Sequence, residues 1–166
     1  MKTFSLPLEP DFQRPLTEAY EMPALIDTGA IVPVFTLYPS NLKRLFDTEL
    51  VATNKQFGGF DGNVNGSVYR IKNFVLGELL FEILEVFVPD KPRLRFPFLF
   101  SATMFYGMAY EIDTINNLFT IKVSDTQHLR RKFEILSLKG KLYPQVDGVL
   151  LQNWDTELID PAFFIL

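Results

Sequence analysis

The sequence predicts a mainly β domain. Short apolar runs rich in Val, Ile, Leu and Phe alternate with turns rich in Gly, Pro, Asn and Asp, the pattern of strands joined by hairpins. The length of 166 residues fits one domain, and a hydrophobic fraction of 48% against 22% charged residues is enough for a folded core. The 17 phenylalanines fit a β-rich core, or equally an apolar surface for self-association.

Composition excludes several function classes. The net charge is −4 and the sequence contains one short cationic cluster, Arg130–Lys132, which we interpret as a solvated face, so no nucleic-acid partner is expected. The chain has no cysteine and a single histidine, His128, which excludes disulfides, thiol nucleophiles and multi-histidine metal sites. We expect no metal, no cofactor and no membrane partner. The lack of cysteine, of a signal peptide and of a long apolar run suggests a cytoplasmic location.

The first 46 residues contain two predicted strands and one helix. Residues 1–15, with three prolines, form either a loose arm or an edge strand. Residues 24–26 and 31–35 are short β-type runs on either side of a tight turn. Apolar residues at i, i+3 and i+4 then predict a short helix over 41–46, with Ser40 as its N-cap.

Glycines and β-branched residues dominate the middle of the chain. Four glycines within residues 57–71, between strand-like ends, predict a long mobile hairpin. Gly77 and the β-branched residues of 74–88 favour strands over a helix. The glutamates of this segment are placed on the solvent side of strands or on a loop rim: Glu78, Glu82 and Glu85.

Residues 96–166 have less regular sequence patterns. Residues 96–100 are predicted as a strand buried on both faces, 101–108 as one or two helical turns, and 110–123 as two strands around an Asn-Asn turn. Beyond 123, residues 125–136 fit a helix, whereas a hairpin turning at Gly140 fits equally. The final "PAFFIL" is too apolar for water and is expected to dock on the protein.

Asp27 is a carboxylate inside an otherwise apolar run, residues 23–35. An isolated buried carboxylate is costly unless it is paired, hydrogen-bonded or protonated. Asp27 is therefore either a turn residue that ends a strand or a group whose chemistry the protein uses.

The stretch "ALIDTGA" (residues 24–30) resembles the active-site signature of aspartic peptidases of the retropepsin-like, single-lobe type. The later features follow the family's order: a glycine-rich hairpin where the family has its flap, then "FPFLFSATMF" (96–105) where it has an apolar strand and a short helix. Residues 110–123 resemble its closing hairpin. The resemblance covers about residues 20–123 and departs from the pattern at Ser101, which replaces the usual glycine.

This resemblance implies an all-β, acid-protease-like closed β-barrel with a glycine-rich flap hairpin and one or two short helices. We expect residues 1–123 to form the peptidase domain and 124–166 to be a C-terminal extension that packs on the domain or on the dimer interface. The implied activity is hydrolysis of peptide bonds in extended polypeptides, with Asp27 as catalytic acid and base, Thr28 bracing the loop, and Gly29 permitting a tight turn. The implied substrate-binding residues are Ala30, Phe57, Gly58, Gly59, Phe60 and Asp61.

The chemistry needs two carboxylates that share one proton, and the chain has one Asp-Thr-Gly. Asp113 lacks the following glycine and Asp147 lacks the hydroxyl residue, so neither readily supplies the second group. The expected active species is a homodimer with Asp27 of both chains at a two-fold axis. The alternative is a non-proteolytic retropepsin-like module that dimerises or binds peptides.

Overall fold

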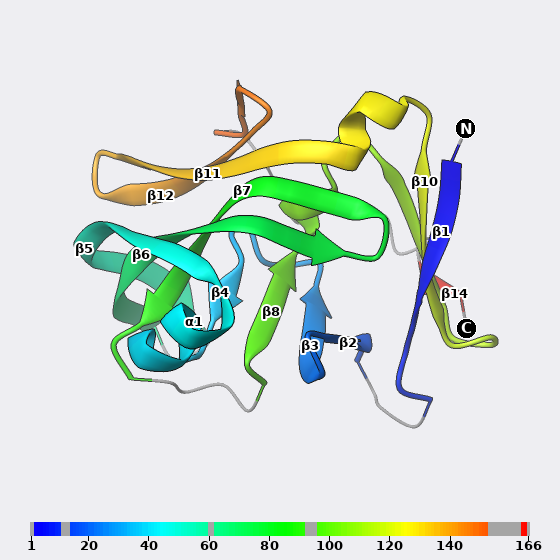
Figure 1. The fold of residues 1–166 in the computed structure, drawn as a ribbon, viewed down its shortest axis with the longest axis horizontal. Coiled ribbons are helices and arrows are strands. Elements are labelled where there is room, and N and C mark those ends of the chain that lie inside the picture. The colour runs from blue at the N-terminus through cyan, green and yellow to red at the C-terminus, as the bar shows by residue number, and fades with distance from the viewer. Residues whose placement is uncertain (1, 11–13, 60–61, 92–95, 153–163, 166) are drawn as a thin grey trace.

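The computed structural model describes every residue except 1, 11–13, 60–61, 92–95, 153–163 and 166, and describes only the backbone of 58–59, 62–63 and 164–165 (Figure 1). Most of the described chain is β-strand, which confirms the predicted class. The strands are β1 (Lys2–Pro7), β2 (Leu16–Ala19), β3 (Met22–Asp27), β4 (Val34–Phe35), β5 (Asp47–Gly59), β6 (Gly62–Leu76), β7 (Leu79–Pro89), β8 (Phe98–Ser101), β9 (Ala109–Asp113), β10 (Leu118–Val123), β11 (Arg130–Leu138), β12 (Lys141–Val146), β13 (Val149–Leu150) and β14 (Phe164–Ile165). The helices are α1 (Pro39–Leu45) and the 3₁₀ turns η1 (Ala102–Phe105) and η2 (Thr126–Leu129).

A four-stranded sheet in the order β1-β10-β9-β14 lies on the right in Figure 1. The β9–β10 hairpin, with Asn117 at positive φ in its turn, is the predicted closing hairpin. β1 pairs antiparallel with β10, so the N-terminal segment is an edge strand rather than a loose arm. β14 pairs in parallel with β9, which docks the described part of the apolar C-terminal segment on the same sheet.

The larger, ten-stranded sheet is organised around β7. One edge of β7 pairs with β6 along its length, and β6 continues into the β5–β6 hairpin. The other edge is shared: β11 pairs in parallel with its first half, and β4 pairs in parallel at Phe87. From β4 the sheet continues through β8 and β3 to β2. The strand pairings described here give two sheets and no closed barrel, so that part of the prediction is not confirmed.

Glu85 lies at the point where β11 leaves β7, and its predicted solvent position is wrong. Its side chain is 3% exposed. One carboxylate oxygen accepts the Ile135 backbone N–H at 2.8 Å and the other accepts Arg70 Nε at 2.9 Å. Where β11 separates from β7, the Glu85 carboxylate thus accepts a β11 backbone N–H that no longer pairs with the β7 backbone. The sequence pattern missed this because the cation that compensates the buried charge comes from a neighbouring strand.

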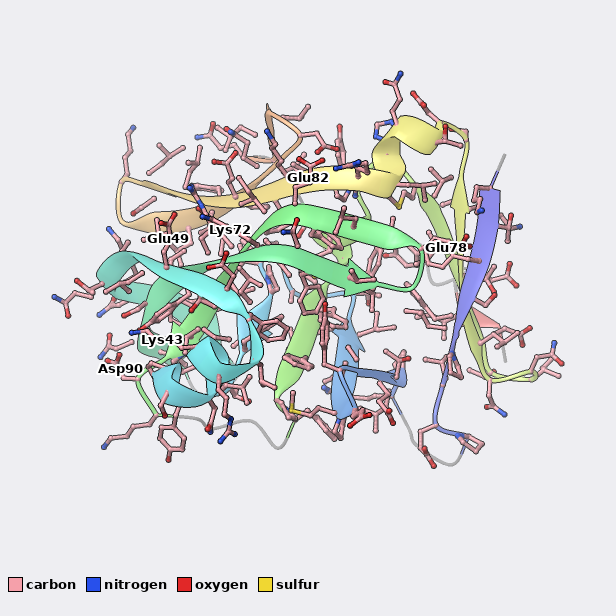
Figure 2. The ribbon with its side chains drawn as sticks, viewed as in Figure 1. Lys43, Glu49, Lys72, Glu78, Glu82 and Asp90 are labelled. Carbon is pink, nitrogen blue, oxygen red and sulfur yellow. The ribbon has the colours of Figure 1, made fainter. Side chains whose placement is uncertain are left out.

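Glu78 and Glu82 do lie at the surface. Figure 2 shows Glu78 at the turn between β6 and β7, beside β1, and Glu82 beside β11. Glu78 pairs with Lys2 at 2.8 Å and Glu82 with Arg130 at 2.9 Å, both in partly exposed ion pairs. Exposed pairs of this kind contribute little to stability, typically about 0–1 kcal/mol.

Of the helix predicted over 125–136, only the 3₁₀ turn η2 is present, and the chain from Arg130 onward forms the alternative hairpin. β11 and β12 are joined by Lys139 and Gly140, both at positive φ, which is the geometry of a two-residue hairpin turn. Along β11 the buried residues alternate, so Arg131, Phe133 and Ile135 face inward. This period of two prevails over the helical spacing of Leu129, Phe133 and Leu136 because β7 offers an open edge for pairing.

The two predicted helical segments are present. α1 occupies 39–45, but Ser40 is not its N-cap: Tyr38 is the N-cap residue, without a side-chain hydrogen bond, and Pro39 is the first helical residue. The fixed φ of proline suits that first position, and the helix starts two residues earlier than predicted. η1 provides the helical turn expected in 101–108.

Aromatic rings fill the core between β4, β6 and β8. The ring centroids of Phe35 and Phe98 lie 4.6 Å apart, and Phe74 lies within 6.2 Å of Phe35, Phe98 and Phe100. Rings at these separations are typical of favourable aromatic packing. Nine of the phenylalanines whose side chains are described are less than 2% exposed, which supports the core interpretation of the high Phe content. No helix in the described ranges is long and apolar enough to cross a membrane.

Candidate active site

Asp27 is the last residue of β3, and three buried residues lead to it. Ala24, Leu25 and Ile26 are at most 5% exposed, and β3 pairs in parallel with β8 so that Asp27 lies opposite Ser101. The buried ladder fixes the strand direction and therefore the point where the carboxylate leaves the sheet. Asp27 and Thr28 are themselves half-buried, which explains how an apolar run tolerates the charge.

The loop after β3 folds back on the Asp27 carboxylate. The Gly29 backbone N–H donates to Asp27 Oδ1 at 2.9 Å, and the Ala30 N–H donates to the Asp27 carbonyl at 3.1 Å. Within the described part of the chain, Asp27 Oδ2 has no hydrogen-bond partner. One oxygen is thus fixed by the backbone, and the other is available to a reactant.

Gly29 allows the Asp27 carboxylate to lie close to the backbone, and the position does not require an unusual backbone conformation. It is not among the residues at positive φ, so the tight turn does not depend on its conformational freedom. A Cβ at this position would lie 3.3 Å from Asp27 Oδ1, closer than most real contacts of that kind. The missing side chain lets the carboxylate approach the backbone N–H.

Two buried hydroxyl groups, for which the sequence pattern indicated no role, lie on the β8 side of this loop. Thr103 Oγ1 donates to the Ile31 carbonyl at 2.6 Å and lies 2.8 Å from Ser101 Oγ. Thr103 has one hydroxyl proton, which goes to Ile31, so Ser101 is the donor in the Ser101–Thr103 pair. The departure from the glycine pattern at Ser101 was the signal in the sequence that this position is used differently.

The glycine-rich hairpin predicted over 57–71 exists as the end of β5 and the start of β6. Gly58 and Gly59 pair with Asn63 and Gly62 in an antiparallel ladder, whereas Phe60 and Asp61 lie outside the described residues. Its mobility and its role as a flap stay predictions.

Two positions in this hairpin are fixed by packing on β7. The Phe57 ring packs 5.6 Å from that of Phe87. Gly66 is a packing position, because a Cβ there would lie 2.4 Å from the Val88 carbonyl oxygen. Of the four glycines on which the predicted mobility rests, Gly66 is thus explained by the lack of space for a side chain.

The other two candidate carboxylates are engaged in turns. Asp113 accepts hydrogen bonds from the Asn116 backbone and side chain and from the Ile115 N–H, which lower its pKa. Asp147 accepts the Lys132 N–H at 2.8 Å and lies 3.6 Å from the Arg131 guanidinium. No group of three or more potential metal ligands occurs among the residues described.

The interpretation of the cluster Arg130–Lys132 as a solvated face is wrong for Arg131. Its neighbour Arg130 is 70% exposed, as a solvated residue should be, but the Arg131 side chain is 1% exposed. Its guanidinium donates to the Met104 carbonyl at 2.6 Å and the Tyr106 carbonyl at 2.7 Å. Burial lowers the pKa of Arg131, while the charge of Asp147 opposes that change. The alternating pattern of a strand would have identified Arg131 as inward-facing.

Comparisons with known proteins support the fold. No protein-family model matches the sequence, and no curated protein matches it. A solved structure that does match is that of a retropepsin-like aspartic protease from Rickettsia conorii, with a TM-score of 0.53 and 16% sequence identity. The match covers 74% of this chain and 91% of that chain. The predicted resemblance is therefore confirmed at the level of the fold.

Proposed function

We propose that this chain is an aspartic endopeptidase that acts as a symmetric homodimer, with one Asp27 from each chain. The observation that carries the proposal is the Asp27 carboxylate at the end of β3, with Oδ1 held by the Gly29 N–H in a fold shared with a retropepsin-like protease. The remaining carboxylates with a similar sequence context, Asp113 and Asp147, are occupied by hydrogen bonds elsewhere. A second chain is then the source of the second carboxylate.

In the proposed reaction, two Asp27 carboxylates at close range share one proton, because two adjacent negative charges are unfavourable. The ionised carboxylate removes a proton from a bound water, and the water oxygen attacks the substrate carbonyl carbon. The protonated carboxylate donates its proton to the carbonyl oxygen. The tetrahedral intermediate then collapses and the carbon–nitrogen bond breaks: the protonated carboxylate gives its proton to the leaving amine, while one hydroxyl of the intermediate returns its proton to the other carboxylate, which releases the acid product and restores the shared proton. No metal or cofactor is required.

The neighbouring residues are proposed to support this step. Gly29 N–H orients the Asp27 carboxylate, and the Thr28 hydroxyl braces the loop against its counterpart in the partner chain. The β5–β6 hairpin closes over an extended polypeptide and excludes water. In this proposal Ala30 and residues 57–61 contact the substrate, which carries apolar side chains near the cleaved bond.

The test is a mixing experiment with a peptide or casein substrate. Because the active species is a dimer, specific activity should fall on dilution. Adding the Asp27→Asn variant in equal amount should leave about a quarter of the dimers with two intact chains, so activity per wild-type chain falls to about half. A monomer with concentration-independent activity, unaffected by the variant, would contradict the proposal. Dimers without peptide cleavage would instead favour the non-proteolytic binding module.

A further inference from the structure

We infer that Arg131 is a positioning residue for the Asp27 loop, contributed by a strand outside the segment that resembles a peptidase. The consequences for activity rest on the proposed function, whereas the structural linkage does not. Arg131 belongs to β11, and Asp27 lies more than a hundred residues earlier in the chain. The connection between them runs through η1.

The first step of this connection is the contact between Arg131 and η1. The guanidinium donates to the carbonyls of Met104 and Tyr106, at the C-terminal end of this four-residue 3₁₀ turn. Carbonyls at a helix end have no partner within the helix, and a positive charge there is favourable. A single 3₁₀ turn has little stability of its own, so its position depends on such outside contacts.

The second step connects η1 to the loop. Thr103, inside η1, donates its hydroxyl proton to the Ile31 carbonyl, and both Ser101 and Thr103 are fully buried. The loop from Asp27 to Ile31 is therefore anchored at both ends. Its start is held in the β3–β8 ladder, and its end is held by Thr103. If η1 moves, the second anchor moves with it.

β11 provides a firm base for Arg131. Its parallel pairing with β7 includes Arg131 opposite Phe81, and Glu85 holds the Ile135 N–H farther along the strand. On the other side, Asp147 accepts the Lys132 N–H. Arg131 thus reaches η1 from a strand fixed on two sides, which makes the C-terminal hairpin part of the support for the proposed catalytic loop.

The experiment compares Arg131→Met with Arg130→Met as the matched control. Both substitutions replace an arginine on β11 by an unbranched apolar residue, but Arg130 is exposed and faces away from η1. Amide hydrogen exchange is measured by mass spectrometry on the purified full chain at a temperature where both variants are folded. We expect exchange in residues 27–31 and 102–106 to accelerate about tenfold or more in Arg131→Met, because two buried carbonyls lose charged donors. Arg130→Met should match the wild type.

Kinetics provide the second measurement. In Arg131→Met, kcat should fall about tenfold while KM changes less than about twofold, since misplacing the carboxylate affects the transition state more than binding. Arg131→Lys, which keeps the charge and can reach one carbonyl, should restore part of kcat. Loss of stability with unchanged kcat and no rescue would overturn the inference.

A third variant keeps the inference testable if Arg131→Met does not fold. Thr103→Val keeps the side-chain shape and removes the donor to Ile31, so it should accelerate exchange in 27–31. Faster exchange in 102–106 for Arg131→Met or Arg131→Lys, with 27–31 unchanged, would show that the linkage stops at η1 and would refute the inference. If the wild type cleaves no peptide, the proposed function fails while the exchange data still decide the linkage.

Discussion

Asp27 and Glu85 are both carboxylates in apolar runs of sequence, yet the structure treats them in opposite ways. Glu85 is almost completely buried, and both of its oxygens have partners, the Ile135 N–H and Arg70. Asp27 is half-buried, and among the described residues only its Oδ1 has a partner, a backbone N–H two residues away.

This difference separates a carboxylate that joins strands from one that can react. Glu85 connects β6, β7 and β11, so each of its two oxygens serves the fold. The hydrogen bond to Glu85 is the largest cause of the raised pKa of Arg70, so each partner favours the charged form of the other. Among the described residues, the Asp27 side chain has no distant partner, and one of its oxygens is free of protein partners. A reacting group requires that freedom.

The largest expected effect is the loss of activity in Asp27→Asn. Asparagine keeps the shape and accepts the Gly29 N–H, but it cannot act as base, so peptide cleavage should fall by about 10²–10⁴-fold or more. The melting temperature should stay within a few degrees of wild type, because the Asp27 side chain has no long-range partner among the described residues. Circular dichroism and a peptide cleavage assay measure both quantities. A large loss of stability would mean that Asp27 resembles Glu85 after all.

Glu85→Gln should show the opposite phenotype. Glutamine can still accept the Ile135 N–H, but Arg70 loses its buried counter-charge, and we expect the free energy of unfolding to fall by about 2–3 kcal/mol. Activity per folded molecule should be unchanged. The matched control is Glu82→Gln on the same strand, which breaks only an exposed pair with Arg130 and should cost less than about 1 kcal/mol. Equal losses in urea denaturation for the two variants would contradict the structural role of Glu85.

Gly29→Ala tests whether the orientation of Asp27 matters. The added methyl group would lie 3.3 Å from Oδ1, so the carboxylate must move by a few tenths of an ångström. We expect about a tenfold decrease in kcat and a stability change within about 1 kcal/mol. Single-turnover kinetics would isolate the chemical step. An unchanged rate would show that the Gly29 hydrogen bond is incidental.

Asp113, at the end of β9, is a third kind of carboxylate: it is half-buried and has several hydrogen-bond donors in the turn that follows. Its substitution should have the smallest effect. Its lowered pKa means that it stabilises the fold above its unfolded pKa, and that this contribution disappears as pH falls through the folded pKa, below about pH 4. Asp113→Ala should therefore lower the melting temperature slightly at neutral pH, and its difference from wild type should shrink as the pH falls below about 4. A difference that does not shrink in acid would assign the effect to packing.

The sequence by itself determined most of the strands and the position of the candidate site. Apolar runs bounded by glycine, proline and asparagine mark β3, β8 and the β9–β10 hairpin, because local backbone preferences and burial both act over a few residues. The same local signals place Asp27 at the end of a strand, and the motif around it predicted a fold that a solved aspartic protease shares.

Only the tertiary structure decided which polar groups are buried and what they hold. The signal for Arg131 was ambiguous, because its strand also has helical spacing and its carbonyl partners lie 25 and 27 residues away. Glu85 pairs with Arg70 on a neighbouring strand, and Thr103 reaches Ile31 across 72 residues. The cost of burying a polar group is offset by partners distant in sequence, so local patterns cannot reveal it.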